Sequence, residues 1–385
     1  MTRASYTTLA DVTFPSLDRE CVPKDAGKKM PAPVVSIIID NYNYARFLPR
    51  CIESALAQTH ANTEVIVVDD ASTDDSRDVI LRYPKVVPVL KEKNGGQASA
   101  LNAGFRESRG EIVIFLDSDD YLEPDAASRV VASWKPGTAK LQYRLVLISE
   151  EGRKLDLFPP SDIQFDSGDV VPLLLSKGRY HTAVTSGNAF DRKVLDRLLP
   201  IPEVEFRISA DGYLVTLAPL FGRVISLDEP LGAYRLHGNN AWAIRDNTDG
   251  LRFRRALEHD MQRHRVLRGK AGELGLKMED EPGLQDWLHL ESRISSLCLE
   301  PELHPIPADR RASLGWKGFW ASSRDSRLPW KRRAILTAWF LSVGMLPRSL
   351  ANRAIAWRLA PVSRPWILTR MLKLLRDVQG TTKDN

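Results

Sequence analysis

Two apolar runs that each end in a cluster of aspartates limit the fold of this chain most. The runs cover residues 64–68 and 111–116, and the clusters are Asp69-Asp70 and Asp117-Ser118-Asp119-Asp120. Short apolar runs bounded by turn residues are typical of buried strands in a parallel sheet. Because ligands bind at the carboxyl ends of such strands, we expect both clusters to line one crevice.

Strands and helices alternate through the first part of the chain. Residues 34–39 and 86–90 are two further strand-like runs. The segments between the strands have helical spacing or helix-capping residues, so we expect helices over 46–58, 74–83 and 97–108 and from Pro124 onward. This alternation predicts right-handed strand–helix–strand units and a mainly parallel α/β sheet flanked by helices.

The pattern changes further along the chain. Residues 139–157 alternate as antiparallel strands do, and a helix near 209–220 and a strand over 224–227 follow. From about residue 250 the pattern is almost wholly helical, with helices at 251–269 and 284–299 and shorter basic ones after Pro305. We therefore expect a helical C-terminal extension.

Composition favours a cytoplasmic protein. Residues 1–33 are polar and lack the apolar core of a signal peptide. The three cysteines form no disulfide or zinc pattern, and no run of 18 apolar residues would make an orthodox membrane span.

The aspartate clusters have two interpretations. They could be solvated turns at the starts of the following helices. Ser72 or Thr73 would then cap a helix, and acidic residues in its first turn would complement the helix dipole. Crowded carboxylates can also bind a divalent cation, and substrate phosphates commonly supply the rest of its coordination shell. The loop 40–44 has no Gly-x-Gly-x-x-Gly pattern, which argues against a nicotinamide dehydrogenase.

Four ordered motifs resemble those of the family 2 glycosyltransferases of the GT-A fold. They are residues 35–44 (VSIIIDNYNY), 67–74 (VVDDASTD), Asn94-Gly95-Gly96 with Asn102-Ala103-Gly104, and 115–120 (FLDSDD). The resemblance covers about residues 34–240. It implies a Rossmann-like GT-A sheet and transfer of a sugar from a nucleotide-diphospho-sugar, with inversion and with Mg²⁺ or Mn²⁺ as cofactor.

The resemblance also implies roles for single residues on the donor side. The loop of Asn41, Tyr42 and Asn43 would face the base and ribose, with Asp70 on the base and Asn94 beside it. Asp119 would be the direct metal ligand, and Asp117 would lie near the ribose and the metal. Asp40 departs from the proline or threonine that is usual at its position.

Three later segments complete the predicted site. Asp211 lies where the family has the Asp of a Glu-Asp pair and would be the catalytic base, although Ala210 replaces the Glu and Asp211 could instead cap a helix. The segment 231–240 resembles the family's closing motif, so Arg235 would bind phosphate and His237 would approach the metal. Gly187 and Asn188 could border the acceptor pocket.

The tail has a distinct composition. Residues 301–385 hold 16 Lys and Arg against five Asp and Glu, a net charge of +11, and six of the nine tryptophans. Its longest apolar run, 334–346, is too short to span a bilayer. Basic helices with tryptophan and leucine fit an anionic membrane surface, although packing on the catalytic domain would account for them too. No motif indicates nucleic-acid binding.

We therefore predict a cytoplasmic hexosyltransferase at the cytoplasmic face of the membrane, which extends a polysaccharide or lipid-linked glycan. The alternatives are a nucleotidyltransferase or a catalytically degenerate GT-A scaffold. A retaining glycosidase is disfavoured, because its two catalytic carboxylates would not need the metal cluster. The expected divisions are a polar extension (1–33), a catalytic domain (34–240), a helical segment (241–300) and a basic tail (301–385).

Overall fold

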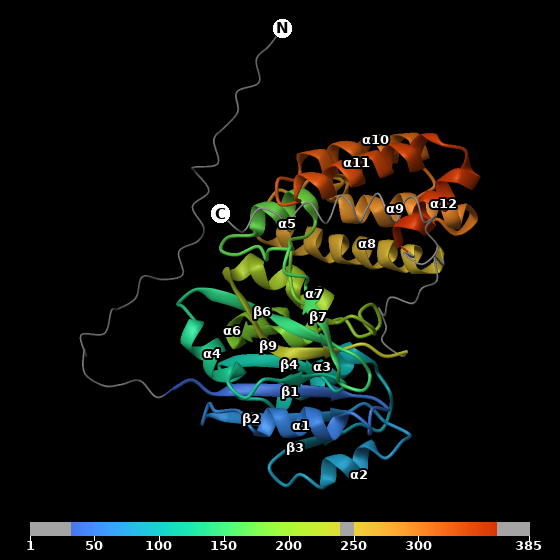
Figure 1. Ribbon diagram of the computed structural model, residues 1–385. Helices are drawn as coiled ribbons and strands as arrows, with labels where there is room; N and C mark the ends of the chain where they lie inside the picture. The colour runs from blue at the N-terminus through green and yellow to red at the C-terminus, as the bar shows by residue number, and fades with distance from the viewer. Residues whose placement is uncertain (1–31, 239–249, 360–385) are drawn as a thin grey trace, which may run out of the picture. The chain divides into compact units, whose positions relative to one another are not determined.

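The computed structural model describes residues 32–238 and 250–359 (Figure 1). Within these residues, nine strands form one sheet, and one half of it is parallel in the order β3-β2-β1-β4. The strands of this half are β1 (Val35–Asn41), β2 (Thr63–Asp69), β3 (Val87–Leu90) and β4 (Ile112–Asp117).

The other half of the sheet is mixed. After β4 the order continues β8-β6-β9-β5, and β7 pairs with the outer part of β6. β8 is antiparallel to both β4 and β6, whereas β6 and β9 run parallel. The bounds are β5 (Tyr121–Leu122), β6 (Thr138–Ile148), β7 (Lys154–Phe158), β8 (Asn188–Asp191) and β9 (Arg223–Arg235).

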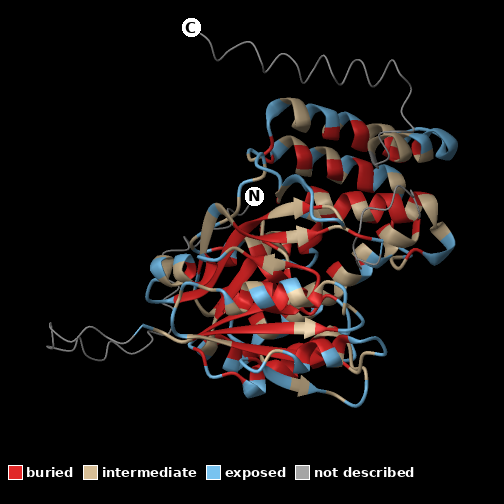
Figure 2. Ribbon diagram, turned by 60° about the horizontal axis from the view of Figure 1, so that its bottom comes forward, coloured by how far each residue is buried: buried red, intermediate tan, exposed pale blue. Residues whose placement is uncertain are grey.

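Helices cover both faces of the sheet, because successive residues of the central strands point to opposite sides. Val35, Ile37 and Ile39 of β1 belong to the core under α1, α2 and α4, while Ile38 belongs to the core under α3, α5, α6 and α7. Figure 2 shows the central strands as continuously buried. The bounds are α1 (Leu48–Leu56), α2 (Ser76–Leu81), α3 (Gln97–Glu107), α4 (Ala126–Ser133), α5 (Val171–Lys177), α6 (Arg192–Leu198) and α7 (Asp211–Leu217).

Strand register brings the acidic residues to one edge. Asp40 at the end of β1 is in register with Asp117 of β4, and Asn41 is in register with Asp69 of β2. The predicted fold class, a mainly parallel sheet between helices, is confirmed.

Most predicted elements of this part form within a few residues of their expected bounds, with three differences. The helix after Pro124 begins at Ala126, and the helix expected over 209–220 ends as α7 at Leu217 and continues as a 3₁₀ turn over Ala218–Phe221. The strand expected over 224–227 extends to Arg235, because β9 pairs along most of β6 and then with β5.

The C-terminal helices share one further core. They are α8 (Gly250–Glu273), α9 (Trp287–Leu299), α10 (Arg311–Arg324), α11 (Trp330–Met345) and α12 (Arg348–Leu359). Phe253, Leu290, Leu314 and Phe340 are buried in it. The predicted basic tail (301–385) is described only to Leu359, and most of the 1–33 extension also lies outside the described residues.

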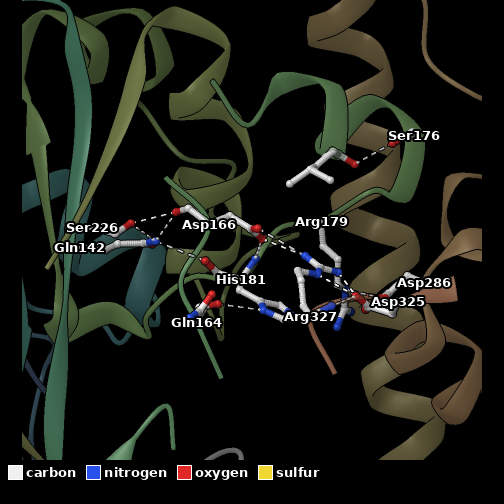
Figure 3. Close-up of polar contacts among 11 residues, drawn as sticks. Gln142, Gln164, Asp166, Ser176, Arg179, His181, Ser226, Asp286, Asp325 and Arg327 are labelled. Carbon is white, nitrogen blue, oxygen red and sulfur yellow. Dashed lines mark hydrogen bonds and ion pairs between the residues drawn. The ribbon is translucent and has the colours of Figure 1, made fainter. Parts of the chain in front are cut away.

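Ion pairs join these helices to the sheet side (Figure 3). Arg327, between α10 and α11, binds Asp325 at 2.9 Å and Asp166 at 3.1 Å. The backbone carbonyl of Asp166 accepts hydrogen bonds from Gln142 and Ser226 of the sheet. Arg179 pairs with Asp286 at 2.8 Å and also with Asp260 of α8.

Over the described ranges, every helix is either too short or too polar to cross a bilayer.

Helices α10 and α11 come into close backbone contact at Gly315 and Gly344, which gives a first prediction. A Cβ on Gly315 would lie 2.7 Å from the Cα of Gly344 and 2.8 Å from the carbonyl oxygen of Phe340. We expect Gly315→Ala to lower the thermal unfolding midpoint, because overpacking against backbone costs about 1–3 kcal/mol.

Gly269→Ala in α8 is the matched control, since a Cβ there meets nothing within 4 Å. It should raise the midpoint slightly, because alanine stabilises a helix by about 1 kcal/mol relative to glycine. The same shift in both variants would contradict the close approach.

Candidate active site

One cleft of about 790 Å³ opens at the carboxyl ends of β1, β2 and β4. Eight segments that are distant in the sequence line it. The lining residues include Asp40–Tyr44, Asp70, Asn94, Gly96, Gln97, Asp117–Asp119, Thr182–Thr185, Arg207–Ser209, Asp211, Gly212, Tyr234, His259 and Arg263. Of the predicted site residues, the cleft brings together Asn41, Tyr42, Asn43, Asp70, Asn94, Asp117, Asp119 and Asp211.

The loop after β1 is held by the loop after β2. Asn41 donates to Asp69 Oδ1 at 3.1 Å and to Ser72 Oγ at 3.2 Å. Asn43 has φ +60°, and its Oδ1 accepts from the backbone N–H of Thr73 at 2.7 Å. The Tyr42 side chain is left 44% exposed beside the cleft, so it can contact a ligand there.

Asp70 is buried and organises the glycine loop before α3. Its carboxylate pairs with Lys91 and accepts from the backbone N–H groups of Gly95 at 3.0 Å and Gly96 at 2.6 Å. The side chain of Asn94 donates to the backbone carbonyl of Asp70 at 3.2 Å. Asp70 therefore holds the glycine loop in place and is itself one of the residues that line the cleft.

Gln97 connects the two sides of the cleft. Its side-chain nitrogen donates to Asp117 Oδ1 at 2.9 Å, and its side-chain oxygen accepts from the backbone N–H of Ala210 at 2.9 Å. One neutral amide thus links the end of β4 to the start of α7, where Asp211 lies.

Asp119 and His237 are in contact. His237 Nε2 lies 2.8 Å from Asp119 Oδ2, and the imidazole packs against the rings of Tyr44 and Phe47. Both residues are at least nine-tenths buried. The predicted metal ligands Asp119 and His237 are therefore neighbours in space although they are far apart in the sequence.

Burial and mutual repulsion make this cluster hard to ionise. Burial, and then the charge of Asp119, raise the pKa of Asp40 to about 7. The pKa of Asp117 is raised well above its usual value by burial and then by Asp40, and that of Asp120 by burial and then by Asp119. Asp40 Oδ1 is buried without a hydrogen-bond partner. The cluster is thus short of positive charge.

Asp211 begins α7 and lies half-buried in the cleft wall. Burial raises the pKa of its carboxyl, and the positive charges of Arg263 and then Lys140 oppose that shift. A carboxylate with a raised pKa beside a ligand cleft has the properties of a general base.

Four predicted residues do not line this cleft: His237, Arg235, Asn188 and Gly187. The guanidinium of Arg235 donates to the backbone carbonyls of Asp119 and Glu150, both at 2.9 Å, and lies over the ring of Phe47. Asn188 is fully buried and donates to the carbonyls of Ala183 and Val184. A Cβ on Gly187 would lie 2.7 Å from Ala183, so this glycine permits tight packing behind the wall.

The sequence interpretation missed several lining residues. Gln97 follows the Gly-Gly pair directly, and a polar side chain at a helix start was a usable signal. Thr182–Thr185 line the cleft in place of the predicted Gly187 and Asn188. His259 and Arg263 share one face of α8, but nothing in their spacing connects that helix to the sheet.

The fold and the cleft together define an α/β protein with an acidic ligand site at its strand ends. Residues 36–198 match the model of the family described as glycosyl transferase family 2. The chain is 38% identical over 212 residues to an uncharacterized glycosyltransferase of Nostoc sp., a match that covers 54% of this chain and 66% of that relative. The chain belongs to the family 2 glycosyltransferases.

Further comparisons cover less sequence or show only the fold. Identity to the hyaluronan synthase of Pasteurella multocida is 41% over 116 residues, which is 29% of this chain and 12% of that synthase. The crystal structure of S. aureus TarS 1–349 in complex with UDP-GlcNAc superimposes with a TM-score of 0.50 at 15% identity, covering 85% of this chain and 90% of that one. The fold is that of the GT-A glycosyltransferases.

The buried pair of Lys91 and Asp70 gives a second prediction. We expect Lys91→Met to lower the free energy of unfolding by about 2–4 kcal/mol, because it leaves a buried carboxylate without its cation. Urea denaturation of the full chain measures the change.

Lys93→Met is the matched control, since Lys93 is exposed two residues away. Its effect should stay within about 0.5 kcal/mol. A loss in Lys91→Met no larger than in this control would contradict the assigned role of Lys91.

Proposed function

We propose that the protein is an inverting, divalent-metal-dependent glycosyltransferase that transfers a hexosyl group from a nucleotide-diphospho-sugar to a glycan hydroxyl. One observation carries the proposal: Asp211 lines the same cleft as the loop of Asn41–Asn43, the Asp70–Asn94 wall and the Asp117–Asp119 turn. A base and a donor site are thus within reach of one bound substrate pair.

The nucleotide would occupy the side of the cleft formed by β1 and β2. The exposed ring of Tyr42 offers a stacking surface for the base, and Asp70 and Asn94 border the same space. The diphosphate would then lie toward Asp117 and Asp119.

The residues present fit a Mg²⁺ or Mn²⁺ ion. Asp119 with His237 would hold it and Asp117 lies beside them, which matches the preference of hard cations for carboxylate oxygens. In the described ranges no three or more His, Cys, Asp or Glu residues gather into a complete metal site, so the diphosphate and water would supply the remaining ligands. When bound, the ion supplies positive charge to the departing diphosphate.

Asp211 would act on the acceptor side. Its carboxylate takes the proton of the acceptor hydroxyl while that oxygen forms a bond to the anomeric carbon. The bond from the anomeric carbon to the diphosphate oxygen breaks on the opposite face, and the nucleoside diphosphate leaves. A single displacement inverts the anomeric configuration.

A polysaccharide or lipid-linked glycan is the acceptor class that we propose. Relatives named hyaluronan synthase, chondroitin synthase and a putative teichuronic acid biosynthesis glycosyltransferase support it. TarS in complex with UDP-GlcNAc makes that nucleotide sugar a reasonable first donor to assay. Residues 34–240 would form the catalytic domain.

The alternatives differ in support. No observation favours a nucleotidyltransferase, since the family match concerns glycosyltransferases. A degenerate scaffold is consistent with Ala210 in place of the expected Glu, and loss of turnover with retained nucleotide binding would identify it.

We also propose that α10 and α11 contact an anionic membrane at the cytoplasmic face. Trp316, Phe319 and Trp320 form an aromatic cluster on α10, and Trp316 and Trp330 are 55% and 66% exposed. Residues 311–359 contain ten Lys and Arg and a single acid, Asp325, which is buried and paired with Arg327. Exposed tryptophan on a basic surface suits the interface of anionic lipid.

Asp211→Asn gives a third prediction. We expect kcat with UDP-GlcNAc and Mn²⁺ to fall by about 10²–10⁴ while the donor KM changes little, because only proton transfer is lost. In the wild type, kcat should fall as pH decreases through the raised pKa of Asp211, since protonation removes the base. This acidic limb should disappear in the variant.

Asp78→Asn, at an exposed position of α2, is the control and should keep wild-type kcat. EDTA should abolish turnover, and Mn²⁺ should restore it. Equal turnover in Asp211→Asn and wild type would remove Asp211 from the mechanism. Absence of turnover with a panel of nucleotide sugars, despite nucleotide-diphosphate binding, would favour the scaffold.

Binding to lipid vesicles gives a fourth prediction. The wild type should sediment with phosphatidylglycerol vesicles but not with phosphatidylcholine vesicles, and high salt should weaken binding. The double variant Trp316→Ser/Trp320→Ser should bind at least about tenfold more weakly, because its apolar contact is removed. The control Leu155→Ser/Val204→Ser removes exposed apolar side chains elsewhere. Equal binding by both double variants would contradict the proposed surface.

A further inference from the structure

Helix α8 forms part of the cleft wall although it lies outside the family-matched residues 36–198. Its side chains His259 and Arg263, one helical turn apart, border the cleft beside Asp211 and Gly212. The C-terminal helical region therefore contributes directly to the candidate active site.

Arg263 lies across the first turns of α7. Its Nε donates to Thr216 Oγ1 at 2.8 Å, and its Cδ would be 3.4 Å from a Cβ on Gly212. The same Cβ would be 2.7 Å from His259 Nε2. Glycine directly after Asp211 thus lets α8 approach the start of α7 closely.

The guanidinium of Arg263 has little compensation from other residues. Its NH2 nitrogen is buried without a hydrogen-bond partner. Its NH1 lies 3.9 Å from Asp260 Oδ1, and Asp260 already pairs with Arg179 and His289. Asp260 and Asp211 are the two carboxylates that stabilise its charge.

The charged groups around Asp211 come from several elements. From α8 these are Arg263 and His259, and burial lowers the pKa of His259 to about 4, so it is neutral near pH 7. Lys140 of β6 is fully buried against the neutral groups of Gln142, Tyr180 and Thr182, and burial lowers its pKa well below the usual value. The charges of Asp40 and Asp117 act from the opposite wall.

Arg263 is therefore the permanent cation beside Asp211, because a guanidinium stays protonated in proteins. We propose that Arg263 is a positioning residue for sugar transfer: from α8 it keeps the Asp211 carboxylate ionised at the start of α7. The proposal rests on the proposed role of Asp211 as base. Under this proposal, the C-terminal helices contribute a residue that supports sugar transfer.

The test measures Asp211 directly in the full chain. Aspartate carboxyl carbons are labelled with ¹³C, and the Asp211 resonance is assigned by its loss in Asp211→Asn. Its titration midpoint should move up by about one pH unit or more in Arg263→Gln and by less in Arg263→Lys, since an opposite charge nearby lowers a carboxyl pKa by about 1–3 units. Arg265→Gln, at an exposed position of the same helix, should leave it unchanged.

Kinetics separate this inference from the proposed function. With UDP-GlcNAc and Mn²⁺, the acidic limb of the kcat profile should shift with the Asp211 midpoint, while donor KM stays constant. A shifted midpoint with full activity in Asp211→Asn would refute the base but retain the electrostatic coupling. An unchanged midpoint in both Arg263 variants would overturn the inference, and Arg263→Lys keeps the test valid if Arg263→Gln unfolds.

Discussion

The candidate site depends on the register in which the parallel strands β2, β1 and β4 pair. Because β1 pairs with both β2 and β4, Asp40 and Asp117 lie side by side, and Asn41 lies beside Asp69. The same register packs Ile37, Ile39 and Ile114 into one core. A shift of one residue would turn these side chains to the other face and separate the carboxylates. Core packing thus determines the charge density of the cleft.

That charge density is tolerated only where neighbouring groups compensate it. Asp69 and Asp70 have Arg77, Lys91 and backbone N–H groups as partners, so their carboxylates stabilise the loops that follow the strands. Asp40 and Asp117 have weaker compensation, and burial raises their pKa values. The difference between the two aspartate clusters, which look alike in sequence, lies in their partners. A cation would relieve the second cluster far more than the first.

The sequence predicted what depends on local pattern. Strand runs, helix starts and the order of the four motifs were enough to place Asp70, Asp117 and Asp119 at one edge. Contacts that depend on tertiary packing could not be predicted in this way. The direction of the Arg235 guanidinium depends on the carbonyls of Asp119 and Glu150, and the approach of Arg263 depends on how α8 packs on α7. Neither contact produces a periodic pattern in the sequence from which it could be predicted.

The replacement of the expected Glu by Ala210 also has a physical account. Position 210 is fully buried, and its backbone N–H binds Gln97, which in turn binds Asp117. A glutamate there would place another carboxylate near Asp211, Asp117 and Asp40, where burial already resists ionisation. The neutral amide of Gln97 connects the start of α7, where the proposed base Asp211 lies, to Asp117 at the end of β4 without adding charge. The positive charge of Arg263 and the absence of a second acid next to Asp211 in the sequence both favour the ionised carboxylate.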